Sequence, residues 1–327
     1  MSNRIAIIGA GLAGISIACL INKKFDTEIF EKSRGVGGRM STRNASPFNF
    51  DHGAQYFKIK SKEFMNFATN LIEKEVIKTW SFRHAFFNEN NLEKLKMITD
   101  KDKYYVGAPN MNSIIHYLSK GFKINLNTKI NKIIKKNNKW CLYDEDKKTF
   151  SEFNWVILCL PAEQALSLIY EKIYFYNLLK HIKMRGCFSL LIGRDKDLNL
   201  NFDAAIIQNN DIVWIASNNS KPNRNNNHSL IINSSYDYAK KNINTSREVV
   251  IDHMLNLIYK LTKKDLSDSA LISLHQWRYA EAENNPVQNY FIDENEKIAV
   301  CGDWFINSRV EDAFTSAHEL SKEIMKQ

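Results

Sequence analysis

The amino-acid sequence predicts an α/β fold, in which a Rossmann-like dinucleotide-binding domain is joined to a second domain built on a mixed sheet. Three observations predict it. The chain opens with an apolar strand, a glycine-rich turn and a helical stretch. Residues 155–160 form an apolar run that is typical of a parallel strand covered on both faces. Residues 188–235 contain strands in a nearly continuous series, and a length of 327 residues suits about two domains.

Residues 4–43 carry the first motif. An apolar strand over 5–8 ends in the run GAGLAG (residues 9–14), a helical stretch follows, and a strand over 27–30 leads to Glu31. In this dinucleotide-binding unit the first glycine makes the tight turn, the second admits a pyrophosphate and the third lets the helix pack on the strand. The helix N-terminus offers N–H groups to phosphate, and a carboxylate at this spacing binds ribose hydroxyls. The predicted cofactor ligands are Gly9, Gly11, Gly14 and Glu31.

Residues 5–21 are almost wholly apolar, so a secretion signal or a membrane anchor is the alternative interpretation. The run is short for a membrane span of about 20 residues. A strand over 25–31 follows it, where a signal peptide has a small-residue cleavage site. We therefore expect the chain to start inside its fold.

A second glycine motif, Gly37-Gly38-Arg39, stands six to eight residues beyond Glu31 and is followed by Met40. Two adjacent glycines open space beside a pyrophosphate, while the arginine adds positive charge or pins the loop. The spacing resembles the second phosphate motif of two-dinucleotide-domain flavoproteins such as the flavin-containing amine oxidases. The alternative is a flexible basic loop. We predict FAD as the cofactor, with Gly38, Arg39 and Met40 among its ligands.

A third element lies near the end of the chain. A short apolar strand ends at Gly302, Asp303 follows, and Arg309 and Val310 lead into a helix. Asp303 can accept a hydrogen bond from the ribityl chain, and the helix N-terminus can point at the flavin N1/C2=O edge, where its dipole stabilises negative charge. The alternatives are that Asp303 is a turn or cap residue and that Arg309 is a surface charge. We predict that Gly302, Asp303, Arg309 and Val310 contact the cofactor.

Composition narrows the function classes. The net charge is +9, but the lysines are scattered among asparagines and no nucleic-acid-binding signature accompanies them, so we expect no nucleic-acid partner. The five cysteines are odd in number and lack CxxC spacing, which predicts buried free thiols in a reducing compartment and no metal centre. We expect a cytoplasmic protein with no membrane partner.

The pattern of elements divides the chain. We predict a discontinuous FAD domain over 1–60, 105–165 and 271–327, and a substrate domain over 61–104 and 166–270. Within them we expect a helix over 61–78, a hairpin over 82–95, a meander with its first strand over 124–134, a helix over 165–180 and a polar surface loop over 217–229.

Motifs along nearly the whole chain carry a family resemblance. The segments GAGLAG, FEKSRGVGGRMST, DHGAQYF, SKPNR, HQWRYA and CGDWFINSRVEDA resemble those of bacterial renalases, FAD enzymes of the amine-oxidase-like superfamily. The resemblance implies oxidation of 2- and 6-dihydro isomers of NAD(P)H to NAD(P)⁺, with O₂ reduced to H₂O₂. It implies active-site walls formed by Tyr56 and Trp277, and cofactor contacts by Leu12, Ala13, Glu31, Lys32, Arg39, Gln55, Tyr56, Ile130, Asp303 and Val310.

The chain departs from that family's pattern at three positions. Asn233 stands where renalases commonly have histidine, which bears on substrate positioning and makes Asn233 a third candidate catalytic position. Ser308 and Asp312 replace glycines of the closing motif, where we expect only a change of loop shape.

The implied chemistry needs no general base, because loss of hydride from a dihydronicotinamide restores an aromatic pyridinium and releases no proton. Orientation against flavin N5 is then the main requirement, and Trp277 and Tyr56 could stack the ring. Trp277 could equally be a core residue of its strand. The histidines His52, His116, His275 and His318 show no ligand spacing and are expected to be structural.

Two other functions stay open. One is another oxidoreductase of the superfamily, an amine oxidase or a desaturase, although no lysine can be placed near the flavin from the sequence. The other is a flavin-binding protein without turnover. The sequence leaves NAD versus NADP preference and oligomeric state undetermined.

Overall fold

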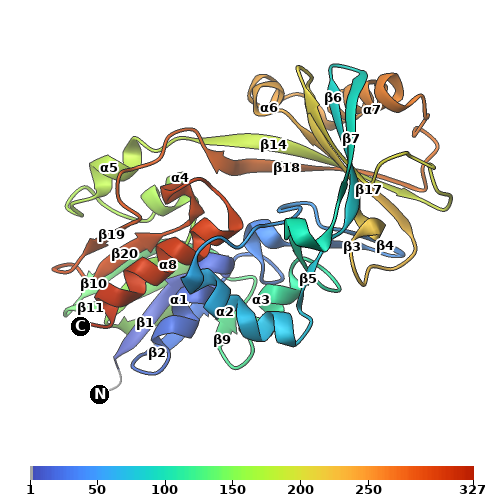
Figure 1. Ribbon diagram of the computed structural model, residues 1–327. Helices are drawn as coiled ribbons and strands as arrows, with labels where there is room; N and C mark the ends of the chain where they lie inside the picture. Colours follow the sequence, from blue (N-terminus) through green and yellow to red (C-terminus); the bar gives the residue numbers. More distant parts are fainter. Residues whose placement is uncertain (1–2) are drawn as a thin grey trace.

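The computed structural model describes residues 3–327, and both ends of the described chain lie on the same side of the molecule (Figure 1). Its architecture rests on two large sheets, and the predicted α/β class is confirmed. The helices are α1 (Leu12–Ile21), α2 (Lys62–Glu73), α3 (Ser113–Leu118), α4 (Ala162–Leu166), α5 (Tyr176–Lys180), α6 (Tyr236–Asn242), α7 (Arg247–Thr262) and α8 (Val310–Ile324).

The six-stranded sheet carries the glycine-rich turn. Its strands pair in parallel except at the β19 edge, in the order β19 (Tyr290–Asp293), β20 (Ile298–Cys301), β13 (Trp155–Leu158), β1 (Arg4–Ile8), β2 (Asp26–Phe30) and β9 (Lys123–Asn125). Ile5 and Ile7 face the apolar side chains of α1 and α8, whereas Ala6 and Ile8 face the opposite layer. Both faces are therefore covered, which explains why these strands are apolar throughout.

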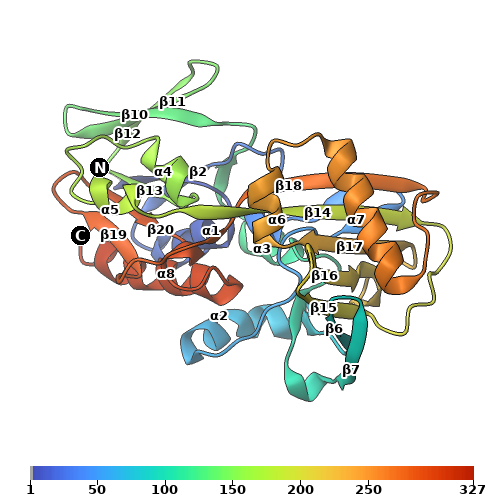
Figure 2. The ribbon, with the colours of Figure 1, turned by 90° about the horizontal axis from the view of Figure 1, so that it is seen from above.

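The opposite layer is a three-stranded meander of β10 (Ile130–Lys136), β11 (Lys139–Asp144) and β12 (Thr149–Phe153), together with α4 and α5 (Figure 2). The predicted first strand of the meander, 124–134, was wrong in extent. Its beginning is β9 in the parallel sheet, and only the part from Ile130 onward belongs to the meander, because a turn at residues 126–129 separates the two.

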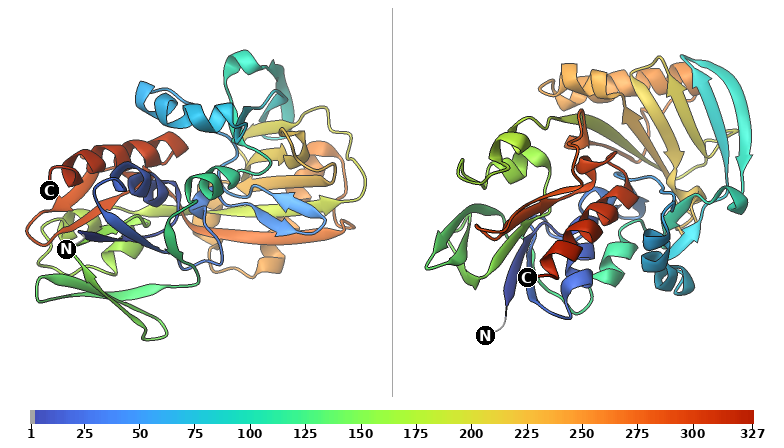
Figure 3. Two further views of the ribbon diagram at one scale, coloured as in Figure 1. Left: turned by 90° about the horizontal axis from the view of Figure 1, so that it is seen from below. Right: turned by 60° about the vertical axis from the view of Figure 1, so that its left-hand side comes forward.

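The seven-stranded sheet is mixed, with one parallel pair, β15–β6. The order of its strands is β18 (Leu271–Ala282), β14 (Met184–Arg194), β17 (His228–Ser234), β16 (Ile212–Ser217), β15 (Ala204–Gln208), β6 (Phe82–Asn88) and β7 (Asn91–Ile98). The helices α6 and α7 cover one face of this sheet (Figure 3). Strand periodicity then directs alternate side chains, such as Ser189 and Asn233, to the other face.

The long strands β14 and β18 run side by side from one half of the molecule to the other (Figure 1). Met184 and Ala282, at one end of the pair, join the core of the meander layer, whereas Leu190 and Leu274 join the core beneath α6 and α7. The domain boundaries stay a prediction. The strand pairing nevertheless places residues 271–282, predicted to belong to the FAD domain, in the seven-stranded sheet.

Two smaller sheets complete the fold, β3 (Arg43–Ala45) with β4 (Phe48–Phe50) and β5 (Ile77–Thr79) with β8 (Tyr105–Gly107). The helix predicted over 61–78 ends at Glu73, because Glu75 adopts positive φ and the chain then enters β5. The helix predicted over 165–180 is two short helices, α4 and α5, and α6 was not predicted. Within residues 3–327, none of the helices has the length and apolar character needed to cross a membrane.

Candidate functional site

The glycine-rich turn joins β1 to α1. Gly9 has φ +107°, and a Cβ atom there would lie 2.4 Å from the carbonyl oxygen of Cys159. A Cβ on Gly14 would lie 2.0 Å from the carbonyl oxygen of Gly9, so helix α1 packs on the turn at a distance that only glycine permits. No side chain caps the N-terminus of α1 at Gly11, which leaves its first N–H groups available to an anion. Leu12 and Ala13 form the first turn of that helix.

The second glycine motif lies directly against the first. Gly37 donates its backbone N–H to the carbonyl oxygen of Ala10 at 2.9 Å, and Gly37 and Gly38 both have positive φ. A Cβ on Gly38 would lie 3.2 Å from the Cα of Gly11. The two loops thus form a cradle lined by backbone, which is what a pyrophosphate requires, and the residues present fit a dinucleotide. Met40 is buried beneath this loop.

Glu31 is held in place by backbone donors. Its carboxylate accepts hydrogen bonds from the N–H of Ala10 at 2.9 Å and of Ser33 at 2.8 Å, and the residue is buried. Beside it a cavity of about 340 Å³ is lined by Lys32, Ser33, Asn127, Lys129 and residues 144–146. Ile130 is buried at the start of β10. Two of its lining residues, Lys32 and Ser33, directly follow the glutamate that is predicted to bind ribose.

Arg39 pins the second loop to the third motif. Its guanidinium donates two hydrogen bonds to Asp303, at 2.9 and 2.6 Å, and a third to the carbonyl oxygen of Ala280 at 3.3 Å. Asp303 is 8% exposed and follows Gly302, whose N–H is bound by Ser316. Of the two roles considered for Arg39, the pinning role is the one this geometry supports.

The closing motif begins helix α8 at Val310, as predicted. Asp312 accepts hydrogen bonds from the N–H groups of Asn307 and Arg309, and burial raises its pKa. Ser308 stands at φ +57°, a conformation that glycine adopts more readily, and its hydroxyl accepts the N–H of Ala282. Both departures from the family pattern are thus accommodated by local hydrogen bonds. Arg309 itself is exposed.

Trp277 belongs to an aromatic cluster with two histidines. Its indole N–H donates to the carbonyl oxygen of His52 at 3.0 Å, and the ring of His275 lies 4.6 Å from that of His52 and 4.4 Å from that of Trp277. Burial lowers the pKa of both histidines to about 4, so both are neutral at neutral pH. The sequence did not show that these two histidines lie together, because 223 residues separate them. The available signal was that His275 and Trp277, two residues apart on one strand, face the same side of the sheet.

Asn233 lies in a cross-strand row on the sheet face opposite α6 and α7. Strand pairing sets Ser189 of β14 opposite Asn233 of β17, which is opposite Trp214 of β16. The Ser189 hydroxyl lies 2.8 Å from the Asn233 side-chain oxygen and 3.1 Å from the carbonyl oxygen of His52. Ser189 therefore links Asn233 to the Trp277 cluster.

Tyr56 extends the row at its other end. Its ring lies 5.7 Å from that of Trp214 and 4.7 Å from that of Tyr104, and burial raises its pKa. The residues Tyr56, Trp214, Asn233, Ser189, His52, His275 and Trp277 thus form a continuous band, which we call the site band. The indole nitrogen of Trp214 and Nδ1 of His52 are buried and find no hydrogen-bond partner within residues 3–327. The site band therefore joins all three candidate catalytic positions and offers unused polar atoms.

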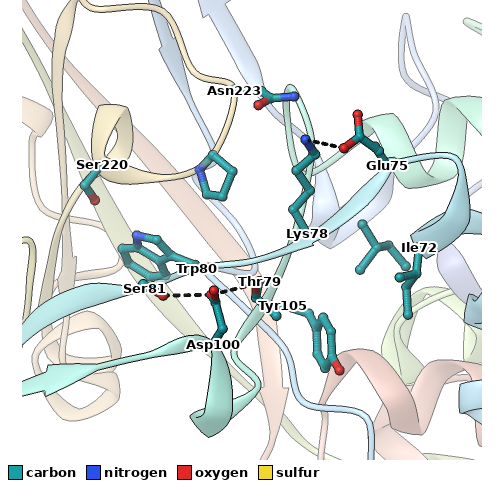
Figure 4. A pocket seen from close by; sticks show the side chains of 12 residues that line it. Ile72, Glu75, Lys78, Thr79, Trp80, Ser81, Asp100, Tyr105, Ser220 and Asn223 are labelled. Atoms are coloured by element: carbon teal, nitrogen blue, oxygen red, sulfur yellow. Dashed lines mark hydrogen bonds and ion pairs between the residues drawn. The ribbon is translucent and has the colours of Figure 1, made fainter.

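A larger cavity, of about 550 Å³, lies elsewhere between α2, β5 and the segment at residues 220–223 (Figure 4). Its wall includes Trp80 and Asp100, and Asp100 accepts hydrogen bonds from Thr79 and Ser81. None of the predicted cofactor or catalytic residues lines this cavity. Within residues 3–327, no three histidine, cysteine or acidic side chains are grouped so that they could hold a metal ion.

Comparison with known proteins agrees with the glycine motifs and the sheet order. Residues 7–71 match the NAD(P)-binding Rossmann-like domain family. Mouse renalase is 30% identical over 179 residues, which cover 51% of this chain and 49% of renalase, so the match spans about half the length of that relative.

Solved structures give the fold of the whole chain. A candidate protoporphyrinogen oxidase from Exiguobacterium matches with a TM-score of 0.80 at 11% identity, and putrescine oxidase bound to putrescine matches with 0.72 at 11%; each alignment covers 100% of both chains. The Rossmann-like match agrees with the dinucleotide cradle that the glycine motifs form. About half of the chain is therefore similar to renalase, and the whole chain has the fold of the matched protoporphyrinogen oxidase and putrescine oxidase structures.

Proposed function

We propose that the protein is a FAD-dependent oxidase of the renalase type. Its substrates are the 2- and 6-dihydro isomers of NAD(P)H, its products are NAD(P)⁺ and H₂O₂, and O₂ is the final acceptor. When bound, FAD supplies a two-electron acceptor at N5 and a route for those electrons to O₂. The renalase homology and the oxidase fold support the class of reaction.

The residues that would hold FAD come from all three motifs. The backbone cradle of Gly9, Gly11 and Gly38 would take the pyrophosphate and Glu31 the ribose hydroxyls. Asp303 would accept from the ribityl chain while Arg39 keeps it in place, and the N-terminus of α8 at Val310 would face the ring. Lys32, Gln55 and Ile130 stay predicted contacts.

One observation carries the choice of substrate: the site band is aromatic and uncharged. The low pKa of His52 and His275 and the raised pKa of Tyr56 leave no charged side chain in it at neutral pH. A dihydronicotinamide needs no base, because it gives up hydride and keeps its protons. Neutral aromatic faces favour the pyridinium that forms, and Asn233 and Ser189 can orient its carboxamide.

The test is anaerobic reduction of the purified, FAD-loaded protein. We expect rapid loss of the oxidised flavin absorbance with 2- or 6-dihydroNAD(P), and slow or no loss with the ordinary 1,4-isomer. Readmission of O₂ should restore the absorbance and release one H₂O₂ per turnover. Bleaching by amines alone would assign an amine oxidase instead. A flavin that none of these compounds reduces would favour a non-catalytic flavin-binding protein.

A further inference from the structure

Three buried charges meet beside Gln55, one of the predicted cofactor contacts. The carboxylate of Asp51 lies 2.6 Å from Nη2 of Arg224 and 3.3 Å from Nζ of Lys221, and the three side chains are at most 1% exposed. This arrangement corrects the expectation that residues 217–229 form a polar surface loop, because Asn218, Lys221 and Ser229 of that segment are buried. We call Asp51, Lys221 and Arg224 the charge cluster.

The charge cluster holds one carboxylate and two cations. Burial alone would raise the pKa of Asp51, but both cations and the hydrogen bonds from Thr42 and Met111 outweigh burial and hold it at about 2. The remaining partners of Lys221 are neutral: Gln55 Oε1 at 3.3 Å, Asn218 Oδ1 at 3.0 Å and the ring of Trp80 at 5.5 Å. With Lys221 protonated, the charge cluster therefore carries an excess positive charge away from water.

An uncompensated buried charge is costly to the fold. Arg224 adds to this cost, because its Nε is buried and lacks a hydrogen-bond partner within residues 3–327. A structural role would be served better by Asp51 and Arg224 alone, which form a balanced pair. The second cation therefore needs a different explanation.

Contacts lead from the charge cluster to the predicted FAD ligands. Lys221 binds Gln55, whose amide nitrogen donates to the carbonyl oxygen of Gly53 at 3.1 Å. The next residue, Ala54, donates its N–H to the carbonyl oxygen of Arg39 at 2.9 Å. A Cβ on Gly53 would lie 2.0 Å from that oxygen, so the turn and the Arg39 loop are in direct contact. Arg39 in turn holds Asp303.

We propose that Lys221 is a positioning residue of the flavin site: it holds Gln55, and the excess positive charge that it gives the cluster favours the negatively charged reduced flavin. The proposal rests on the FAD-dependent function proposed above. It uses the general rule that fixed charge in a dry environment stabilises charge that develops nearby. Lys221 acts through Gln55 and through its field, and it takes no proton or hydride from the substrate.

Two substitutions separate this role from a structural one. Lys221→Met removes the charge and leaves the Asp51–Arg224 pair balanced, so the melting temperature should be equal to or above that of the wild type. Lys221→Arg keeps the charge. The matched control is Lys240→Met, which removes a lysine with a 71% exposed side chain that pairs with Glu283 on the surface.

The readouts are the FAD dissociation constant and the midpoint potential of the bound flavin, measured by dye equilibration without any nicotinamide substrate. For Lys221→Met we expect the ratio of reduced to oxidised flavin at a given potential to fall about tenfold, which corresponds to a midpoint potential about 30 mV lower for a two-electron couple. We also expect FAD to bind several-fold more weakly. Lys221→Arg and Lys240→Met should stay within threefold of the wild type. A potential unchanged in Lys221→Met, with or without a lower melting temperature, would overturn the proposal.

A measurement on the wild type covers the case that Lys221→Met does not fold. Burial lowers the pKa of Lys221 to about 8, although Asp51 opposes the shift and Arg224 reinforces it; Gln55, Asn218 and Trp80 are uncharged. The flavin potential should therefore fall with pH more steeply between pH 7 and 9 than in Lys221→Arg. Equal slopes would contradict the proposal. Failure of dihydroNAD(P) to reduce the flavin would refute only the proposed function, whereas a wild type that binds no FAD would refute both.

Discussion

Arg39 and Asp303, 264 residues apart in the chain, form a two-point ion pair that joins the second and third cofactor motifs. A charged pair of this geometry stabilises each motif only while the other is in place. The position of the carboxylate predicted to bind the ribityl chain thus depends on an arginine in a different loop.

Replacing Arg39 by Met or Asp303 by Asn should each weaken FAD binding. The loss of a charged hydrogen bond costs roughly 1.5–3 kcal/mol, and we expect the lower end of this range because the Arg39 side chain is 28% exposed to solvent. The double variant should lose less than the sum of the two, because both substitutions break the same contact. Titration of the apo-protein with FAD measures this coupling. Arg83→Met is the control, since Arg83 forms a similar two-point pair with Asp203 on the other sheet; additive losses at Arg39 and Asp303 would count against the linkage.

Alanine substitutions at different glycines should distinguish an effect on folding from an effect on cofactor binding. Gly14→Ala places a Cβ 2.0 Å from backbone and should destabilise the fold by about 1–3 kcal/mol or more. Gly11→Ala meets nothing nearer than 3.9 Å and should fold normally, but its methyl group enters the cradle and should raise the FAD dissociation constant at least about tenfold. Gly35→Ala, with open space around it, is the control. Thermal melting and FAD titration distinguish the three, and FAD binding by Gly11→Ala at wild-type affinity would contradict the cradle.

For substrate binding, the aromatic ring of Trp277 should matter more than its indole N–H group. Trp277→Phe removes the donor to His52 and should cost about 1 kcal/mol of stability, with little change in the rate of flavin reduction. Trp277→Ala removes the aromatic wall and should raise the KM for the dihydronicotinamide substrate about tenfold or more. Trp140→Phe is matched to the first variant, because it also loses an indole hydrogen bond to a carbonyl oxygen, but in the meander. Equal KM values in all three variants would show that the ring of Trp277 does not contact the substrate.

Acid should weaken the fold through His52 and His275. Their pKa is lowered by burial to about 4 in the folded protein, whereas unfolded histidine takes up a proton near 6.5. The unfolded state then binds more protons, so the stability that these histidines contribute is present above pH 6.5 and is lost as the pH falls toward 4.

For His52 the loss is about 3 kcal/mol, and for the more exposed His275 it is smaller. Urea unfolding at pH 7 and pH 4.5 measures it. His52→Gln should flatten the dependence, and His116→Gln, on the exposed side of α3, should leave it unchanged. A His52→Gln variant as acid-sensitive as the wild type would show that other groups are responsible.

The parts of the fold that could be predicted from the sequence are those that local pattern determines. The turn at Gly9 and the apolar strand over 155–158 each carry their own signal, and the fold class follows from them. Extents were harder to predict. The stretch 124–134 was predicted as one strand, but the structure assigns Ile124 to one sheet and Ile133 to another, with a turn between them.

The part of the site that could not be predicted depends on contacts between distant segments. Lys221 lies in the polar stretch 217–229, and nothing near it in sequence shows that Asp51 will accept it 170 residues away. His52 and His275 pose the same problem, because each is a lone histidine until the sheet brings them within 4.6 Å. Motifs with internal spacing could be interpreted, whereas clusters assembled by folding could not.

The paired strands β14 and β18 have a mechanical consequence. Because they are hydrogen-bonded along their length and anchored in a different core at each end, the two halves of the molecule cannot slide or twist past each other without breaking that ladder. Its irregularity between Arg185 and Cys187, beside Gly186, is the point where the ladder bends most easily. A bend at this irregularity would leave the strand pairing on either side of it intact.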